Sequence, residues 1–368
     1  YADAGEGEST TDLVFTGHNL IAENGTLLTE RRFGTGLTIS EIDVEKLAAE
    51  RRRMNTFTFP TDGPDVWRMS FDLPLTRTRL TRHVSPTPFV PEDPESRQAR
   101  CSEILCIAAL GLKKRLEHTG ARTAVVGLSG GLDSTLAVLI TALAMQMLGR
   151  PATDIIAVTM PCFGTTDRTK SNAVLLAERL GTTLRTVDIS RSVRSHFKDI
   201  GHDPEDHSVT YENAQARERT QVLMDIANAT GGLVIGTGDL SELALGWCTY
   251  NGDHMSNYAV NAGIPKTLVR HLVSFISDDK EAEDPKLSGV LEDILDTPVS
   301  PELLPAVQGE ISQKTEDLVG PYELPDFFLY YVIRWGYAPR KVLRLAARAF
   351  AGQYERTLPV KRPTHLHS

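Results

Sequence analysis

The chain has 368 residues, a length that suits one large domain or two of ordinary size. Hydrophobic residues make up 41% of it, enough for a packed core, and no apolar run approaches the length of a membrane span. A net charge of −9 argues against binding nucleic acid through a basic surface.

Residues 1–83 are rich in short strands and turns, with one helix expected over residues 40–54. Because the chain starts at Tyr1 in a short polar run, we expect it to be an interior piece of a larger protein. Four prolines interrupt residues 84–98, so we predict a linker without a regular element there.

Strands and helices alternate after this linker. A helix is expected first, over residues 96–118, and four nearly continuous apolar strands follow it, each separated from the next by helices. Such a pattern predicts an α/β fold with a doubly wound parallel sheet, which binds ligands at the carboxyl ends of its strands. The expected strands are residues 123–128, 154–160, 183–187 and 233–237, and the expected helices between them are 134–148, 168–180, 192–198 and 213–230.

Two later segments have distinctive compositions. Residues 278–295 are acidic and are expected to form a solvated loop, with a lid over substrate as the alternative. Residues 322–350 are aromatic and helical in pattern, and we expect core packing or a subunit contact there.

The cysteines carry no metal or redox signature. Cys101, Cys106, Cys162 and Cys248 form no CxxC pair and no cluster with zinc spacing. We therefore expect small buried side chains in a reduced, cytoplasmic protein.

The most informative stretch is Gly127-Leu128-Ser129-Gly130-Gly131-Leu132-Asp133-Ser134, which joins an expected strand to an expected helix. A glycine-rich turn at a helix N-terminus directs backbone N–H groups toward one point and suits a phosphate. The serines add hydroxyl donors, and Asp133 offers a carboxylate for Mg²⁺. No Gly-Lys-Ser/Thr follows, so this is not a Walker loop.

The run Ser-Gly-Gly-x-Asp-Ser resembles the PP-loop of the N-type ATP pyrophosphatases, which are adenine nucleotide alpha hydrolase-like, Rossmann-like proteins. Four further motifs, at residues 212–219, 236–247, 249–250 and 261–267, resemble the synthetase domain of glutamine-dependent NAD⁺ synthetases. Residues 1–83 resemble the end of that family's nitrilase-like glutaminase domain. The resemblance implies a glutaminase remnant over 1–83, a linker over 84–98 and a synthetase domain over 99–368.

The implied reaction is the ATP-dependent amidation of nicotinic acid adenine dinucleotide to NAD⁺ through an adenylated intermediate, with release of AMP and pyrophosphate. No residue of this chain matches the family's glutaminase cysteine, glutamate and lysine. We therefore expect free ammonia to be the nitrogen donor here, and glutamine to supply it in the intact enzyme. The family also implies a homo-oligomer.

The resemblance implies a first set of residues that bind ATP and act on its phosphates. Asp133, Glu242 and Lys266 are the expected catalytic residues, and the two carboxylates are expected to share Mg²⁺, because two carboxylates beside a triphosphate would otherwise repel it. Each of three residues has an alternative explanation. Thr237 could simply close a strand, and Lys266 could be an ordinary surface lysine. Met160, assigned to adenine, suits core packing equally well. The ATP set comprises Gly127, Leu128, Ser129, Gly130, Gly131, Leu132, Asp133, Ser134, Met160, Thr237, Lys266 and Ser300.

A second set is assigned to the dinucleotide. Asn213 and Arg217 are four apart and share a helix face, whereas Arg219 points elsewhere. An exposed ion pair is the alternative for Arg217, and core packing is the alternative for Trp247. The set comprises Asn213, Arg217, Glu242, Trp247, Cys248, Thr249 and Tyr250. Near the C-terminus, Glu355 stands where the family has a dinucleotide-binding lysine, so that contact is not assigned.

Two other functions stay open at this stage. The chain could be another PP-loop amidotransferase, although the motifs at 212–219 and 236–247 do not favour one. It could also be a catalytically silent nucleotide-binding fragment.

Overall fold

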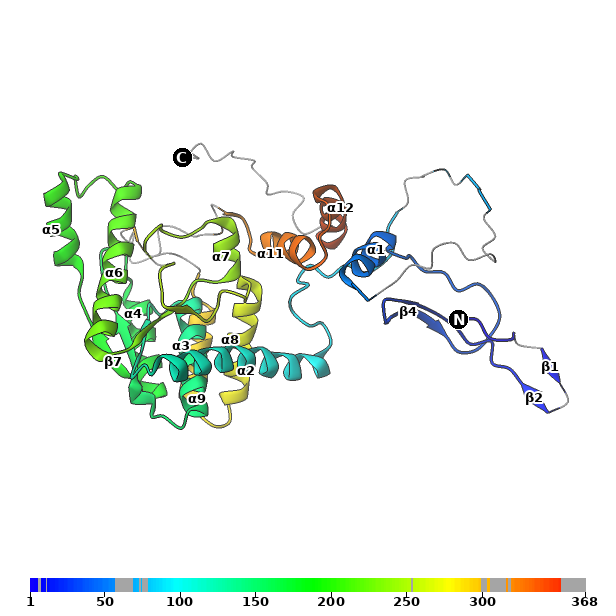
Figure 1. The fold of residues 1–368 in the computed structure, drawn as a ribbon, viewed down its shortest axis with the longest axis horizontal. Coiled ribbons are helices and arrows are strands. Elements are labelled where there is room, and N and C mark those ends of the chain that lie inside the picture. The colour runs from blue at the N-terminus through cyan, green and yellow to red at the C-terminus, as the bar shows by residue number, and fades with distance from the viewer. Residues whose placement is uncertain are drawn as a thin grey trace. The chain divides into compact units, whose positions relative to one another are not determined.

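The computed structural model describes residues 1–5, 8–10, 12–56, 69–72, 74, 79–252, 254–298, 303–304, 316 and 319–351. The chain forms two compact units. One comprises residues 87–329, and the other combines residues 1–86 with 330–368. Figure 1 labels the elements of both.

The larger unit is built on a five-stranded sheet in which every pairing is parallel. The strands lie in the order β7-β6-β5-β8-β9, so the doubly wound α/β fold predicted from the sequence is confirmed. The chain order reverses between β5 and β8, and ligand sites in such sheets lie at this reversal. The strands are β5 (Ala124–Gly127), β6 (Ile155–Thr159), β7 (Thr183–Thr186), β8 (Leu233–Gly236) and β9 (Tyr258–Ala259).

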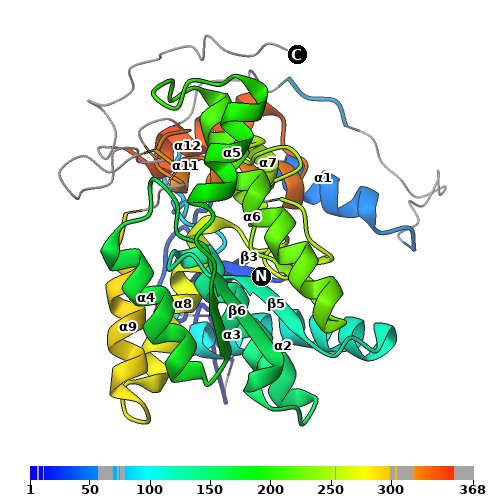
Figure 2. The ribbon, with the colours of Figure 1, turned by 90° about the vertical axis from the view of Figure 1, so that its left-hand side faces the viewer.

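Helices cover both faces of this sheet (Figure 2). Side chains alternate along β5, since Ala124 and Val126 pack into one buried cluster and Val125 packs into the other. The first cluster includes residues of α2 (Pro94–Thr119), α3 (Leu132–Met147), α4 (Asp167–Leu180), α8 (Lys266–Lys280) and α9 (Pro285–Leu295). The second includes residues of α5 (Ser190–Ile200) and α6 (Val209–Thr230).

Two sequence predictions about this unit were wrong. Residues 94–98 were predicted to lack a regular element, but they form the start of α2, which begins at Pro94, and proline is well tolerated in the first turn of a helix. The predicted acidic loop is helical as well. Asp284 accepts a hydrogen bond from the Leu287 N–H at 3.1 Å and caps α9, whose apolar face includes the fully buried Leu291. The acidic run therefore covers the end of α8, a short turn at residues 281–283 and the cap of α9.

Residues 322–350 are largely helical, as predicted. They comprise α11 (Glu323–Leu329), a π-helical turn at Tyr330–Arg334 and α12 (Pro339–Ala349). The first of these belongs to the unit that contains the sheet, and the other two belong to the second unit. A division into compact units does not show whether residues 1–83 come from a glutaminase domain. The domain boundaries at residues 83 and 98 therefore stay predictions.

The described residues of the smaller unit form two antiparallel strand pairs, α1 (Val44–Arg53), the π-helical turn and α12. The strands are β1 (Ser9–Thr10), β2 (Leu13–Val14), β3 (Asn19–Glu23) and β4 (Thr26–Arg31). The helix α1 starts later than the sequence predicted, because the Asp43 side chain accepts a hydrogen bond from the Lys46 N–H and caps it. The unit is therefore rich in short strands, as expected. Among the described residues of both units, none of the helices has the length and apolarity to span a bilayer.

Candidate active site

Among the described residues, no side chain caps the helix that starts at the glycine-rich turn after β5. Gly131 is the N-cap of α3 and provides no side-chain cap, so the first N–H groups of this helix are available to a ligand. Gly130 has a φ of +88°, and a Cβ on it would lie 2.1 Å from the Thr169 carbonyl oxygen. Only glycine permits this conformation and this close approach to α4.

Two serine hydroxyls hold the turn together. The Ser134 hydroxyl donates to the Gly131 carbonyl oxygen at 3.0 Å and lies 3.1 Å from the Ser129 hydroxyl. The Gly131 N–H donates to the Ser129 hydroxyl oxygen at 3.2 Å. The turn is thus ordered by its own side chains, with Ser129 exposed to solvent.

Four charged side chains meet beside this turn. The Lys266 Nζ lies 2.6 Å from Asp133 Oδ2, 3.0 Å from Asp239 Oδ2 and 3.0 Å from Glu242 Oε1. Asp133 follows β5, Asp239 and Glu242 follow β8, and Lys266 follows β9, so three neighbouring strand ends supply the group. We refer to these four residues as the acidic cluster.

The acidic cluster carries more negative than positive charge in a poorly hydrated place. The side chains of Lys266 and Asp239 are 3% and 0% exposed. Burial, together with repulsion by Asp133, raises the pKa of Glu242 to about 8, and burial raises the pKa of Asp239 to about 6. Burial alone would lower the pKa of Lys266, but attraction to the three carboxylates outweighs it, so this pKa lies well above its usual value. The lysine therefore stays protonated.

The carboxylates of the acidic cluster could hold a metal ion. One oxygen from each of Asp133, Asp239 and Glu242 lies within 4.8 Å of the others. The Asp133 Oδ1 is buried and has no hydrogen-bond partner among the described residues. Oxygen donors and surplus negative charge suit a hard divalent cation.

A buried hydrogen-bond network fixes the surroundings of the acidic cluster. The Asn261 amide donates to the Asp133 carbonyl oxygen at 2.9 Å and to the Thr237 carbonyl oxygen at 3.0 Å, joining the loops after β5 and β8. Asp326 accepts from the Ser241 hydroxyl and from the Thr267 N–H, the latter at 2.8 Å. It thereby joins α7 (Leu240–Leu245) to α8.

Several residues at this place were not predicted from the sequence. Asp239 and Asn261 stood within quoted motifs without a role, and the polar residue directly after an apolar strand was the available signal for Asp239. Asp326 and Tyr322 follow no strand and carry no motif. The Tyr322 ring lies 5.3 Å from Lys266 Nζ, and its hydroxyl is buried without a hydrogen-bond partner among the described residues.

Four of the residues predicted for the dinucleotide are joined by hydrogen bonds between α6 and one loop, whereas Glu242 lies in the acidic cluster. The Thr249 hydroxyl donates to Asn213 Oδ1 at 3.2 Å, and Arg217 Nε donates to the Tyr250 carbonyl oxygen at 3.2 Å. The alternative of an ion pair for Arg217 finds no support in the described residues. Trp247 is partly buried, and Cys248 and Tyr250 are exposed.

The remaining predicted residues lie around the turn or outside the described residues. Met160 packs in the second buried cluster, and a Cβ on Gly127 would lie 3.6 Å from its Cε, so core packing and a place beside the turn coexist. Leu128 and Leu132 are buried. Ser300 and Glu355 lie outside the residues that the structure describes. The roles of all these residues stay predictions.

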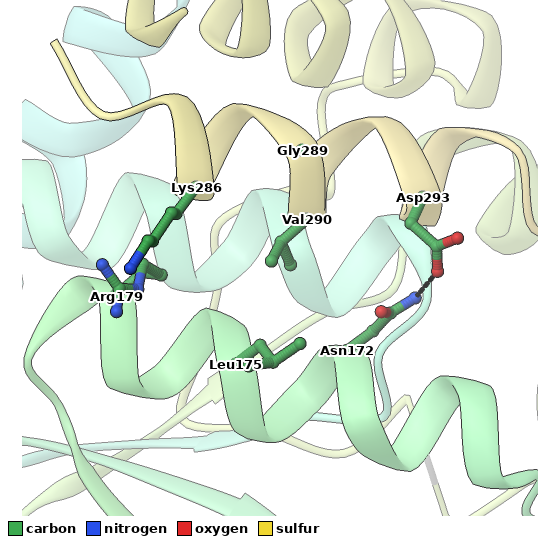
Figure 3. A pocket seen from close by; sticks show the side chains of 7 residues that line it. All are labelled: Asn172, Leu175, Arg179, Lys286, Gly289, Val290 and Asp293. Carbon is green, nitrogen blue, oxygen red and sulfur yellow. Dashed lines mark hydrogen bonds between the residues drawn. The ribbon is translucent and has the colours of Figure 1, made fainter.

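A surface hollow elsewhere does not compete as the site. It lies between α4 and α9, has a volume of about 460 Å³ and is open to solvent (Figure 3). Its side chains include the hydrogen-bonded pair Asn172 and Asp293, 2.6 Å apart, and none of the predicted site residues.

Comparison with known proteins identifies the family. The model of the NAD synthase family matches residues 105–344. The chain belongs to the NAD synthase family.

One similar protein is a glutamine-dependent NAD⁺ synthetase of Mycobacterium leprae. It is 44% identical to this chain, and the match covers 95% of this chain and 54% of that protein. An NH₃-dependent NAD⁺ synthetase of Hyperthermus butylicus is 33% identical over 67% of this chain and 86% of that protein. The chain thus spans about half the length of its glutamine-dependent relatives. An NMN synthetase structure from Francisella tularensis shares the fold, with a TM-score of 0.52, 23% identity and coverage of 72% of this chain and 98% of that one.

Proposed function

We propose that this chain catalyses the ATP-dependent amidation of nicotinic acid adenine dinucleotide to NAD⁺, with release of AMP and pyrophosphate. The observation that carries the proposal is the acidic cluster, in which one protonated lysine and three carboxylates lie beside a turn with free N–H donors. The names of relatives across the NAD synthase family support the same reaction.

In the first step, the nicotinate carboxylate attacks the α-phosphate of ATP and displaces pyrophosphate. The charge on the phosphoryl oxygens and on the leaving group must be stabilised. The N–H groups at the start of α3 and the Ser129 hydroxyl supply donors for the phosphates. Lys266 supplies a fixed positive charge, since its pKa is raised well above the usual value by the carboxylates despite burial.

In the second step, ammonia attacks the acyl carbon of the adenylate, AMP leaves and one proton is released. The chain's contribution is to orient the dinucleotide and exclude water, which would hydrolyse the adenylate. Asn213 and Arg217 hold the loop of Thr249 and Tyr250 on α6, and we propose that this loop receives the nicotinate half.

The three carboxylates of the acidic cluster are proposed to hold Mg²⁺. The residues fit this ion, because all donors are oxygens and the Asp133 Oδ1 has no partner among the described residues. When bound, the ion would neutralise phosphate charge. Lys266 alone leaves a surplus of negative charge beside the expected triphosphate position.

We further propose that the enzyme acts in the cytoplasm as a homo-oligomer and uses ammonia derived from glutamine when a glutaminase is present. The four cysteines are free thiols, which agrees with a reducing compartment.

The decisive experiment mixes the chain with ATP, Mg²⁺, nicotinic acid adenine dinucleotide and ammonium, and measures NAD⁺ and AMP. We expect both products in equal amounts, none with glutamine in place of ammonium and none when a chelator removes the divalent ion. Nicotinic acid mononucleotide serves as the competing acceptor. Amidation of the mononucleotide alone, or ATP binding without AMP release, would contradict the proposal.

A further inference from the structure

Asp326 joins the two helices that carry Glu242 and Lys266. It lies on α11 and is 1% exposed. Its Oδ2 accepts the Thr267 N–H at 2.8 Å and the Thr267 hydroxyl at 2.6 Å, and its Oδ1 accepts the Ser241 hydroxyl. The carboxylate therefore bonds to both α7 and α8.

These bonds supply a cap that α8 lacks in its own sequence. The helix begins at Lys266, and its N-cap is Pro265, which provides no side-chain acceptor. The Ser241 hydroxyl oxygen accepts the Lys266 N–H at 2.9 Å, and Asp326, 59 residues along the chain from Thr267, accepts the next N–H. A carboxylate at this end is also favoured by the helix dipole.

We propose that Asp326 is a positioning residue for the amidation reaction, and that it acts by holding the Lys266 backbone in register with α7. This inference rests on the proposed function. The lysine ammonium must lie within 3.0 Å of carboxylates on two other helices, α3 and α7. Displacement of such a group by about 1 Å can lower a rate on the order of 100-fold. Both carboxylate oxygens of Asp326 are bonded to protein groups, so we assign it no direct contact with a reactant.

The test is a double-mutant cycle with Asp326→Asn and Lys266→Ala in the full chain. With ammonium as donor, we expect Asp326→Asn to lower kcat at least about tenfold and to leave the KM for ammonium unchanged. In the Lys266→Ala background it should lower kcat less than about twofold, because the group it positions is gone. Equal losses in both backgrounds would overturn the proposal in favour of a purely structural role.

Two further measurements keep the result interpretable. Ser241→Ala removes one bond of the same network, and it should show the same dependence on Lys266 if Asp326→Asn fails to fold. Asp43→Ala, which removes the cap of α1 in the other unit, should lower Tm and leave kcat unchanged. If the wild-type chain makes no NAD⁺, the proposed function fails. The affinity for ATP of the same four proteins, measured by calorimetry, then tests the role of Asp326. Losses of affinity that simply add in the double variant would again contradict that role.

Discussion

Glu23 and Glu242 are glutamates beside a lysine, one in each compact unit, and their pKa values shift in opposite directions. Burial alone would raise the pKa of Glu23, but hydrogen bonds from Arg82 and the Asp43 N–H outweigh it, and the pKa falls below its usual value. The pKa of Glu242 rises to about 8 through burial and repulsion by Asp133.

The difference lies in the balance of charge. In the smaller unit, Arg82 contacts both oxygens of Glu23 at 3.0 and 3.1 Å, and Lys46 Nζ lies 3.4 Å away. Nearby, Lys341 Nζ lies 2.5 Å from Asp43 Oδ1, and Tyr337 donates to its Oδ2 at 2.8 Å. We call these six residues the balanced cluster.

In the acidic cluster, by contrast, one lysine serves three carboxylates. A balanced group of buried charges stabilises a fold, whereas a surplus of one sign raises the energy of the free protein and favours a ligand of opposite charge. The comparison therefore supports a structural role for the balanced cluster and the proposed functional role for the acidic cluster, without reference to motifs.

The largest expected effect comes from removing one lysine from each cluster. Lys266→Met should lower NAD⁺ formation on the order of 1,000-fold, because a preorganised positive charge is lost. Lys341→Met should lower Tm and keep the rate within about twofold. Steady-state assays and calorimetric scans of both variants test this, and a comparable loss of rate in both would remove the distinction.

The next largest effect is that removing the charge of one glutamate from each cluster should change the free energy of unfolding in opposite directions. Glu242→Gln should leave the free energy of unfolding of the metal-free protein unchanged or raise it by up to about 1 kcal/mol, because it relieves repulsion. Glu23→Gln should lower it by about 2 kcal/mol, because Arg82 and Lys46 lose their partner. Urea unfolding in the presence of a chelator measures both. Destabilisation by Glu242→Gln as large as that by Glu23→Gln would contradict the charge argument.

The balanced cluster should also control acid unfolding. The folded-state pKa values of Glu23 and Asp43 lie below their usual values of 4.5 and 3.8. The stability they contribute is therefore present above pH 4.5 and is lost as pH falls through the folded-state values. Scanning calorimetry at decreasing pH should show Tm falling over this range, less steeply in Glu23→Gln. An equal slope in that variant would exclude Glu23 as a source.

The smallest expected effect concerns two buried tyrosine hydroxyls. The Tyr322 hydroxyl has no partner among the described residues. Tyr322 directly precedes α11, and its ring lies close to Lys266, so a bound reactant can accept a hydrogen bond from this hydroxyl. Tyr322→Phe should lower kcat/KM about tenfold with little change in Tm. Tyr337→Phe removes a bond to Asp43 and should cost about 1 kcal/mol of stability without loss of rate. A normal kcat/KM in Tyr322→Phe would show that its hydroxyl is not used.

Much of the fold followed from the sequence. The apolar strands and the glycines that end helices predicted the parallel sheet, because each strand in such a sheet is buried on both faces. The predictions of secondary structure were wrong where a single residue starts or caps a helix. Pro94 starts a helix, and Asp284 caps another in a segment that composition alone assigned to a loop.

The sequence by itself determined the glycine-rich turn and the sheet, because these depend on local chain geometry and on apolar patterns along the chain. The resemblance to the NAD⁺ synthetases singled out three members of the acidic cluster, whose roles stay predictions. Only the tertiary structure decided that Asp239 completes the cluster, that Lys266 lies among three carboxylates and that Asp326 caps α8. These contacts join loops and helices far apart in the chain. Their existence depends on how the strand ends and α11 pack, and no local pattern records that packing.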